Sequence, residues 1–334
     1  MRAHCHRLSV RAAALGVLVA SLTAAAAPPS RAQRLQSSDL YRFRSVGAVA
    51  LSPDGRLVAY SVTMFDRPGR PYSQIWIMEL ASQKAVRLGE NKEMASEPLW
   101  SPDGKWVVYP GGEGERSGIW VAHADGSDAT FLAPVKGSNS PLPGQGKGVS
   151  WSPDSKQIAF VSSTPGPETA EASGDPMVIT RYLYKPEASE GNSRFNDNRR
   201  LHIFVVDLAT RNVRQLTEGS NDEHSVDWSP DGREILFISN REPNSDEFFN
   251  YDVFAVRVAD HSIRRLTATE SCEYAPRWSP DGKRIAYAGT KRGLTDRETT
   301  MEDTHVWVMD ADGRHRQEVG AAIDNPSGPS PMVT

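Results

Sequence analysis

The chain has 334 residues, of which 38% are hydrophobic and 24% are charged, and its formal net charge at pH 7 is −4. This composition is typical of a soluble globular protein and excludes a disordered chain or a bundle of membrane spans. The small acidic excess, without any block of like charges, gives no electrostatic reason to expect a nucleic-acid partner.

The N-terminus has the layout of a secretory signal peptide, which we assign to residues 1–27. Arg2, Arg7 and Arg11 precede an apolar run at 12–27 that ends in small residues. The alternative is a membrane anchor, but the run is short and rich in alanine for a span. We therefore expect an exported bacterial protein, periplasmic or secreted, that has no membrane contact after the signal is removed.

Residues 28–39 are expected to form a linker, because they are rich in proline and serine and show no periodicity. The two cysteines of the chain are Cys5, inside the predicted signal, and Cys272. The mature protein would therefore contain one thiol and no intramolecular disulfide, so its fold would depend on packing and strand pairing.

A tight-turn motif recurs along residues 40–320. Its copies read Ser-Pro-Asp-Gly, with serine in place of glycine in the third, and they begin at Ser52, Ser101, Ser152, Ser229 and Ser279. Proline presets the turn, aspartate can bond its own backbone, and glycine accepts a positive φ. Three of the four intervals are 49, 51 and 50 residues. Such a period is the signature of a propeller or another repeat array.

Each repeat contains four strand-like pieces in the same order, which in the second repeat are 98–100, 106–109, 118–122 and 129–132. Four short antiparallel strands in about 45 residues correspond to one blade of a β-propeller. The predicted fold is therefore all-β: a β-propeller of four-stranded antiparallel blades, incomplete, with five blades and the start of a sixth.

The blades of this β-propeller domain, residues 40–320, are expected at about 40–90, 95–134, 148–217, 224–268 and 273–320. Residues 321–334 are similar to the segment that leads into the first strand of a blade, so we interpret them as the truncated start of the next blade.

Large side chains recur at one position just before the turns, where four repeats carry Trp100, Trp151, Trp228 and Trp278 and the first carries Leu51. Repeated identity indicates packing, so these tryptophans are predicted to fill the wedge between neighbouring blades. By the same reasoning the aspartates of the repeated turns are turn residues and not catalytic carboxylates.

One interval is 77 residues long, and its excess forms an insertion at 163–198 in the third blade. Insertions on one face of a repeat array are frequent binding sites. Arg181, Tyr182 and Tyr184 are the candidate substrate-facing residues of this insertion. The alternative is a solvated hairpin with two stacked tyrosines.

The chain lacks the motifs of the common catalytic and metal sites. It contains no Gly-x-Ser-x-Gly, no His-Glu-x-x-His, no cysteine pair for zinc and no glycine-rich phosphate loop. We therefore expect no catalytic residue, no metal and no cofactor in this chain. The scattered histidines are interpreted as hydrogen-bonded structural residues, and the polar run 222–224 as a solvated loop.

The runs at 228–241 and 199–217 resemble the propeller repeat of the prolyl oligopeptidase family of serine peptidases. The similarity extends over roughly residues 40–320 and is greatest for the acylaminoacyl-peptidase and dipeptidyl-peptidase branches, which residues 179–185 of the insertion also resemble. The Trp-Ser-Pro-Asp-Gly repeat by itself is shared with the propeller of the Tol system.

The resemblance implies a function in proteolysis. In that family a propeller covers a C-terminal α/β-hydrolase domain that carries the catalytic serine, aspartate and histidine, and it restricts entry to short or unfolded peptides. The expected partners are therefore peptides and such a hydrolase domain, which this chain lacks. We interpret the chain as the substrate-gating propeller portion of an exported serine peptidase, inactive by itself and prone to aggregate through an uncovered blade face.

Two alternatives remain open. The first is a stand-alone periplasmic propeller of the Tol type that serves as a protein-binding platform, although only about a dozen residues separate the signal from the first blade. The second is a closed ring of five blades that binds a small molecule in its channel, against which the start of a sixth blade counts.

Overall fold

The computed structural model describes residues 35–89, 94–138, 146–166, 197–243, 245–247, 250–290 and 304–319. The chain divides into two compact units, Met1–Leu40 and Tyr41–Thr334, and all strands belong to the second. The predicted signal peptide lies outside the described residues. A short 3-10 helix, η1 (Ser37–Arg42), begins where the composition predicted only an irregular linker. In the described part of the chain, no helix has the length and hydropathy needed to cross a bilayer.

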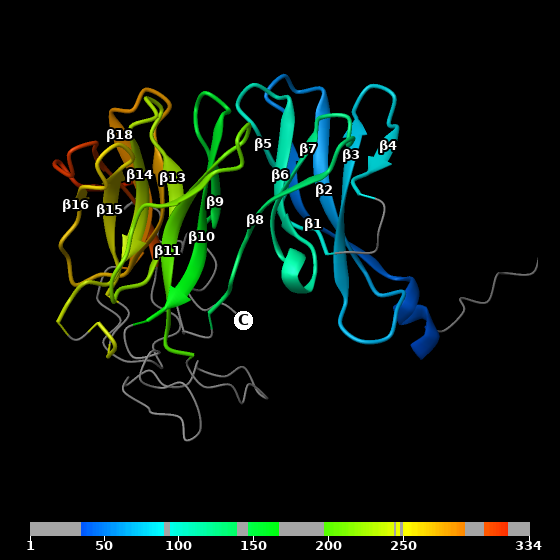
Figure 1. Cartoon of the computed structure of the whole chain (residues 1–334), viewed down its shortest axis with the longest axis horizontal. Coiled ribbons are helices and arrows are strands. Elements are labelled where there is room, and N and C mark those ends of the chain that lie inside the picture. The colour runs from blue at the N-terminus through cyan, green and yellow to red at the C-terminus, as the bar shows by residue number, and fades with distance from the viewer. Residues whose placement is uncertain are drawn as a thin grey trace, which may run out of the picture. The chain divides into compact units, whose positions relative to one another are not determined.

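The described strands of the second unit form five four-stranded antiparallel sheets, here called blades 1 to 5, and in each sheet the strands pair in chain order (Figure 1). Blade 1 contains β1 (Arg44–Leu51), β2 (Leu57–Met64), β3 (Tyr72–Glu79) and β4 (Ala85–Arg87). Blade 2 contains β5 (Leu99–Trp100), β6 (Trp106–Gly111), β7 (Gly118–His123) and β8 (Thr130–Pro134), with a 3-10 turn, η2 (Gly114–Arg116), between β6 and β7.

Blade 3 contains β9 (Val149–Trp151), β10 (Gln157–Pro165), β11 (Arg199–Asp207) and β12 (Val213–Gln215). Blade 4 contains β13 (Glu223–Trp228), β14 (Glu234–Ser239), β15 (Asp252–Arg257) and β16 (Ile263–Arg265). Blade 5 contains β17 (Glu273–Trp278), β18 (Arg284–Thr290), β19 (Thr304–Asp310) and β20 (Gln317–Val319). The prediction of an all-β fold built from four-stranded propeller blades is confirmed. The expected start of a sixth blade, 321–334, lies outside the described residues.

The repeated turn joins the first and second strands of every blade and has the predicted geometry. In blade 5, Ser279 Oγ donates to Asp281 Oδ1 at 2.6 Å, and the same oxygen accepts the Lys283 N–H at 3.1 Å. Gly282 has a φ of +68°, a conformation that glycine adopts without steric cost. The hydrogen bond from Ser279 is the main cause that lowers the pKa of Asp281. The turn aspartates are thus structural, as predicted.

The tryptophans before the turns lie between blades. Trp100 Nε1 donates to the backbone oxygen of Ala50 at 2.9 Å, and Trp151 Nε1 donates to that of Leu99 at 3.1 Å. Each of these indoles therefore binds the inner strand of the preceding blade while its ring is buried. Leu51, which takes the tryptophan position in blade 1, is 59% exposed. All four tryptophans pack in core clusters that join neighbouring blades, so the prediction that they fill the wedge between blades is confirmed.

The hydrophobic core consists of clusters that join one blade to the next. One cluster combines Leu236 and Ile238 of blade 4 with Tyr274 and Ile285 of blade 5, all almost fully buried. Such interfaces stabilise the array because a single blade cannot bury both of its faces. The inner strand β1 of blade 1 is in contrast exposed, with Val46 63% exposed in the described structure.

Cys272 lies in the blade 4–5 core and provides a probe of this packing. Its side chain is fully buried, and burial raises the pKa of its thiol to about 12. Because the thiolate is the reactive form, we expect the Cys272 thiol to react with an aromatic disulfide reagent roughly a thousandfold more slowly in the folded protein than in urea. A Cys272→Ser variant gives the blank. Fast labelling before unfolding would contradict the closed blade 4–5 interface.

Candidate functional site

The predicted insertion at 163–198 begins within the last three residues of β10 and continues as the connection between β10 and β11. These two strands pair as far as Pro165 and Arg199, so the connection leaves blade 3 at the end opposite its repeated turn. The candidate residues Arg181, Tyr182 and Tyr184 lie outside the described residues, and their role stays a prediction.

The same end of the blades carries buried acidic side chains at the starts of the inner strands. Glu223 begins β13 and Glu273 begins β17, and both are 0% exposed. A β-bulge follows each of them, where Ser225 and Ala275 have φ values of +66° and +51°. The bulge adds one residue to the inner strand between the glutamate and the tryptophan. The glutamate is the first residue of this strand and lies at the blade end, and the tryptophan is its last residue and lies in the wedge beside the turn.

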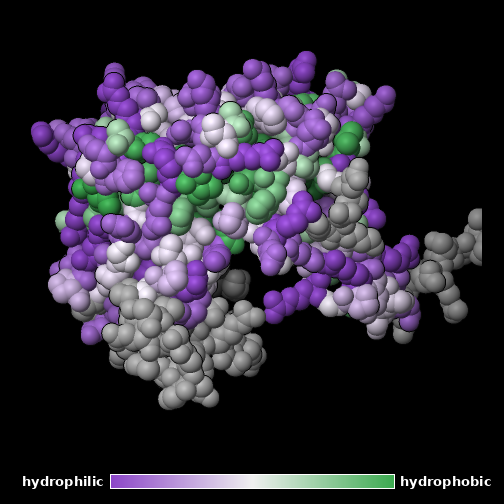
Figure 2. Space-filling model, viewed as in Figure 1, coloured by the Kyte–Doolittle hydropathy of each residue, from purple (hydrophilic) through white to green (hydrophobic). Residues whose placement is uncertain are grey.

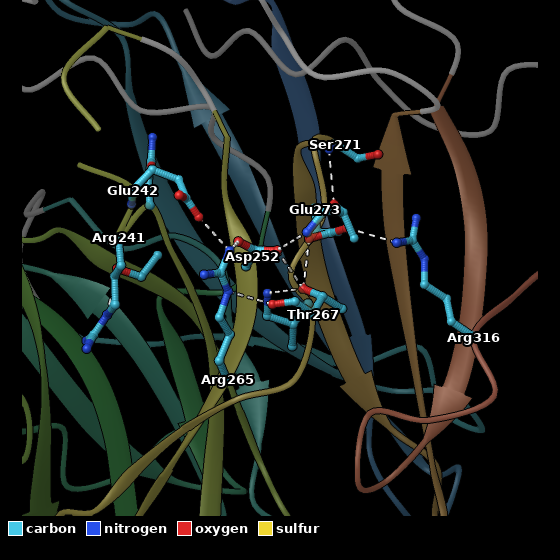
Figure 3. A network of polar contacts seen from close by, with 12 residues as sticks. Arg241, Glu242, Asp252, Arg265, Thr267, Ser271, Glu273 and Arg316 are labelled. Atoms are coloured by element: carbon cyan, nitrogen blue, oxygen red, sulfur yellow. Dashed lines mark hydrogen bonds and ion pairs between the residues drawn. The ribbon is translucent and has the colours of Figure 1, made fainter. Parts of the chain in front are cut away.

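At the blade 4–5 junction, Glu273 faces Asp252, which begins β15, and we call these two residues the carboxyl pair (Figure 3). Thr267 lies between them, with its Oγ1 2.8 Å from Glu273 Oε2 and 3.1 Å from Asp252 Oδ1. Thr269 Oγ1 donates to the other Glu273 oxygen at 2.6 Å, and the backbone N–H of Thr269 donates to Asp252 at 3.1 Å. Residues of the segment after β16 thus tie the two blades together through hydroxyl groups.

The two acids differ in their cationic partners. Arg265 forms an ion pair with Asp252 and a second one, at 2.6 Å, with Glu242. Arg316 stands 3.8 Å from Glu273 Oε1, and Figure 3 shows these two arginines on opposite sides of the carboxyl pair. Asp252 therefore has a direct charged partner, whereas the counter-charge of Glu273 is more distant.

Burial is the main cause that raises the pKa of Glu273 to about 8, and the negative charge of Asp252 adds to it. Burial also raises the pKa of Asp252, although Arg265 opposes that shift. Glu273 consequently carries a proton at neutral pH, and its carboxyl group can donate a hydrogen bond to the Asp252 carboxylate.

The blade 3–4 junction repeats this arrangement with different partners. Glu223 Oε2 lies 2.6 Å from His202 Nδ1 and accepts from Thr217 Oγ1 at 3.0 Å, and Glu223 Oε1 accepts from Arg241 at 2.8 Å. The prediction of a solvated loop at 222–224 was wrong, because Asp222, Glu223 and His224 are all buried. Their polarity suggested exposure, but three donors to Glu223 compensate its desolvation.

The prediction that the histidines are satisfied by hydrogen bonds is wrong for His224. Its Nδ1 lies 3.1 Å from Ser225 Oγ, but its Nε2 is buried and has no hydrogen-bond partner. Burial lowers the pKa of His224 to about 4, so the ring is neutral at pH 7. His202 and His305 contact glutamates through Nδ1 at 2.6 and 2.7 Å, but the Nε2 of His305 is also buried without a hydrogen-bond partner, so the prediction is wrong for this atom as well.

A sequence signal for both junctions exists, but the sequence analysis missed it. Glu223 and Glu273 each lie five positions before a wedge tryptophan and are 50 residues apart, and so are Thr217 and Thr267. Recurrence at the blade period indicates a structural role for these four residues. Each threonine donates a hydrogen bond to the glutamate of the next blade, so these residues can hold adjacent blades together. Among the described residues, no group of three or more His, Cys, Asp or Glu side chains is arranged to hold a metal ion.

Comparison with known proteins places these features in context. Residues 183–317 match the model of the TolB beta propeller domain, PD40. An uncharacterized peptidase, YuxL, of Bacillus subtilis is 25% identical over 228 residues, which cover 66% of this chain and 33% of that protein. Dipeptidyl-peptidase 5 of Porphyromonas endodontalis is 25% identical over 235 residues, covering 64% of this chain and 32% of that protein.

Among solved structures, the acylaminoacyl peptidase of Pyrococcus horikoshii is similar in fold, with a TM-score of 0.62 and 19% identity over 86% of this chain and 41% of that chain. The chain spans about a third of the length of the curated relatives that it matches. The region at 183–317 is therefore similar to the TolB propeller domain, and the two curated relatives described above are peptidases.

Proposed function

We propose that this chain is the propeller portion of an exported serine peptidase and that it controls the access of peptides to a catalytic α/β-hydrolase domain. The observation that carries this proposal is the similarity of about two thirds of the chain to two peptidases. The N-terminal pattern of arginines followed by an apolar run supports export.

The exposed face of blade 1 also supports the proposal. Leu51 occupies the position at which Trp100 and Trp151 bind a preceding blade, and Val46 and Val49 beside it are exposed. Such a face is suited to pack against a further blade of a longer protein. The proposed route for peptides lies at the blade ends that carry the β10–β11 insertion, where Arg181, Tyr182 and Tyr184 would meet the substrate.

Two measurements on the native protein test the proposal: its mass, by immunoblot with an antibody against the propeller, and its labelling by a fluorophosphonate probe for serine hydrolases. We expect a band larger than the mature chain by about 200–250 residues, the size of a hydrolase domain, and labelling of that band. The 334-residue chain expressed alone is the control, which we expect to stay unlabelled because it contains no Gly-x-Ser-x-Gly motif.

A stand-alone platform of the Tol type is the second candidate, and the match to the TolB propeller model favours it. In that case the native band would lie near 34 kDa, the mass of about 307 residues after signal removal. A band of that size without fluorophosphonate labelling would contradict the peptidase proposal and support the platform.

A further inference from the structure

A groove between blades 2 and 3 has a volume of about 340 Å³ and is lined by described residues. Trp106, Leu132 and Leu208 contribute apolar surface, and Lys156 and Arg211 lie at its edge. Hydrophobic residues gather in the middle of the viewed face, over the region of β8 (Figure 2). A cavity of this size and character falls within the range of roughly 300–1,000 Å³ found for small-molecule sites.

The equivalent groove between blades 4 and 5, about 460 Å³, has different chemistry. There Arg264 forms an ion pair with Glu234 at 2.7 Å and donates to the backbone oxygen of Ala311 at 3.1 Å. In the blade 2–3 groove, Thr130 takes the place of Arg264 on the fourth strand and Trp106 takes that of Glu234 on the second. The polar bridge of one junction is thus replaced by an aromatic and apolar wall in the other.

The wall of the blade 2–3 groove is fixed by contacts within the protein. The Trp106 ring stacks on His123, with ring centroids 4.0 Å apart and planes 27° apart. Ser155, which replaces glycine in the turn of blade 3, has a φ of +61°, and its Oγ accepts the Asp103 N–H of the blade 2 turn at 3.0 Å. A site that is already formed loses little free energy in ordering when a ligand binds.

The charges at the edge favour an anion. The Lys156 side chain is 77% exposed and reaches Asp154 only at 4.0 Å, and Arg211 is exposed in the adjacent turn. Asp207 is the acidic residue that lines the groove. Its Oδ1 already accepts three hydrogen bonds from Ala209 and Thr210 of its own turn. Two cations are therefore available to a ligand carboxylate beside the apolar wall.

We propose that the blade 2–3 groove binds an organic acid in which an aromatic or branched aliphatic group is joined to a carboxylate. The apolar group packs against Trp106 and Leu132, and the carboxylate pairs with Lys156 and Arg211. The same chemistry occurs in a free N-acyl amino acid and in the C-terminal residue of a peptide. The site lies at the outer strands between two blades and does not depend on peptidase activity.

Titration calorimetry of the full-length protein with N-acetyl-L-phenylalanine tests the site, with the corresponding uncharged amide as a matched ligand. We expect a dissociation constant of about 0.1–1 mM for the acid. The uncharged amide is expected to bind to the wild type at least about tenfold more weakly than the acid does. The double variant Lys156→Gln/Arg211→Gln is expected to bind the acid at least about tenfold more weakly than the wild type does, because the charged hydrogen bonds are lost in both cases. A pentapeptide ending in phenylalanine that binds more tightly than the free acid identifies a peptide C-terminus as the source, and equal affinity identifies the free acid.

Arg233→Gln is the control variant, because Arg233 follows the blade 4 turn as Lys156 follows that of blade 3 but lies outside the lining of the groove. It should bind the acid like the wild type. Trp106→Ala should abolish binding, and if that variant does not fold, the double variant decides. The absence of binding to the wild type at about 5 mM, far above the expected constant, or equal binding by the double variant, would overturn the proposal.

Discussion

Replacing Glu273 by glutamine is expected to stabilise the protein at pH 8.5 and above and to leave its stability almost unchanged near pH 5. The pKa of Glu273 rises from 4.5 to about 8 in the folded protein. A raised carboxyl pKa means that the folded state binds the proton more tightly, so this contribution to stability is complete below pH 4.5 and lost as the pH rises through 8. The loss amounts to roughly 3–5 kcal/mol.

Glutamine reproduces the protonated acid, because its amide can donate to Asp252 while its oxygen accepts from Thr267. The variant should therefore escape this loss, which grows as the pH rises from 4.5 and is nearly complete above pH 8. Urea unfolding of the variant and the wild type at pH 5, 7 and 9 measures this difference. His224, whose pKa is lowered to about 4, makes the free energy of unfolding rise with pH below pH 6.5, which is opposite to the effect of Glu273. The contribution of His224 cancels in the comparison because both proteins contain this residue.

Glu223→Gln is the matched comparison and should have the opposite effect. Glu223 has Arg241 at 2.8 Å and His202 at 2.6 Å, so the substitution removes the charged partner of the half-buried Arg241 guanidinium and a carboxylate contact of the buried His202 ring. Breaking such a pair costs about 3–5 kcal/mol. If Glu273→Gln destabilised the protein at pH 9 as Glu223→Gln is expected to, the ion pair of Glu273 with Arg316 at 3.8 Å would outweigh the cost of burying the Glu273 carboxylate.

The second large effect is expected for Trp151→Ala, which should lower the free energy of unfolding by about 3–5 kcal/mol. The ring is buried between blades 2 and 3, and its Nε1 donates to the Leu99 oxygen. Truncation would leave a cavity in this interface and an unpaired backbone oxygen. Urea unfolding followed by far-UV circular dichroism gives the change in free energy.

Leu51→Ala provides the control at the equivalent position of blade 1. Leu51 is 59% exposed, so its truncation should change the free energy of unfolding by no more than about 0.5 kcal/mol. Equal losses for the two variants would show that the face of blade 1 is covered in solution, and blade 1 would then contact a partner that the present structure lacks.

Much of this fold follows from the sequence by itself. The turn motif, the alternation that follows it and the recurring tryptophans predicted four-stranded blades, and the structure confirms them down to the positive φ of Gly282. These features are local: turn chemistry and strand periodicity act over fewer than about ten residues, and repetition makes each signal stronger.

The polar residues required the tertiary structure. Asp252 and Glu273 are 21 positions apart, and they meet because an inner strand of one blade starts beside the third strand of the preceding one. The burial of Glu223 and Glu273, and with it their different pairing to arginine and histidine, depends on which side chains the neighbouring blade supplies. Hydrophilic residues in a sequence predict solvent exposure, and only blade packing decides which of them lose their water.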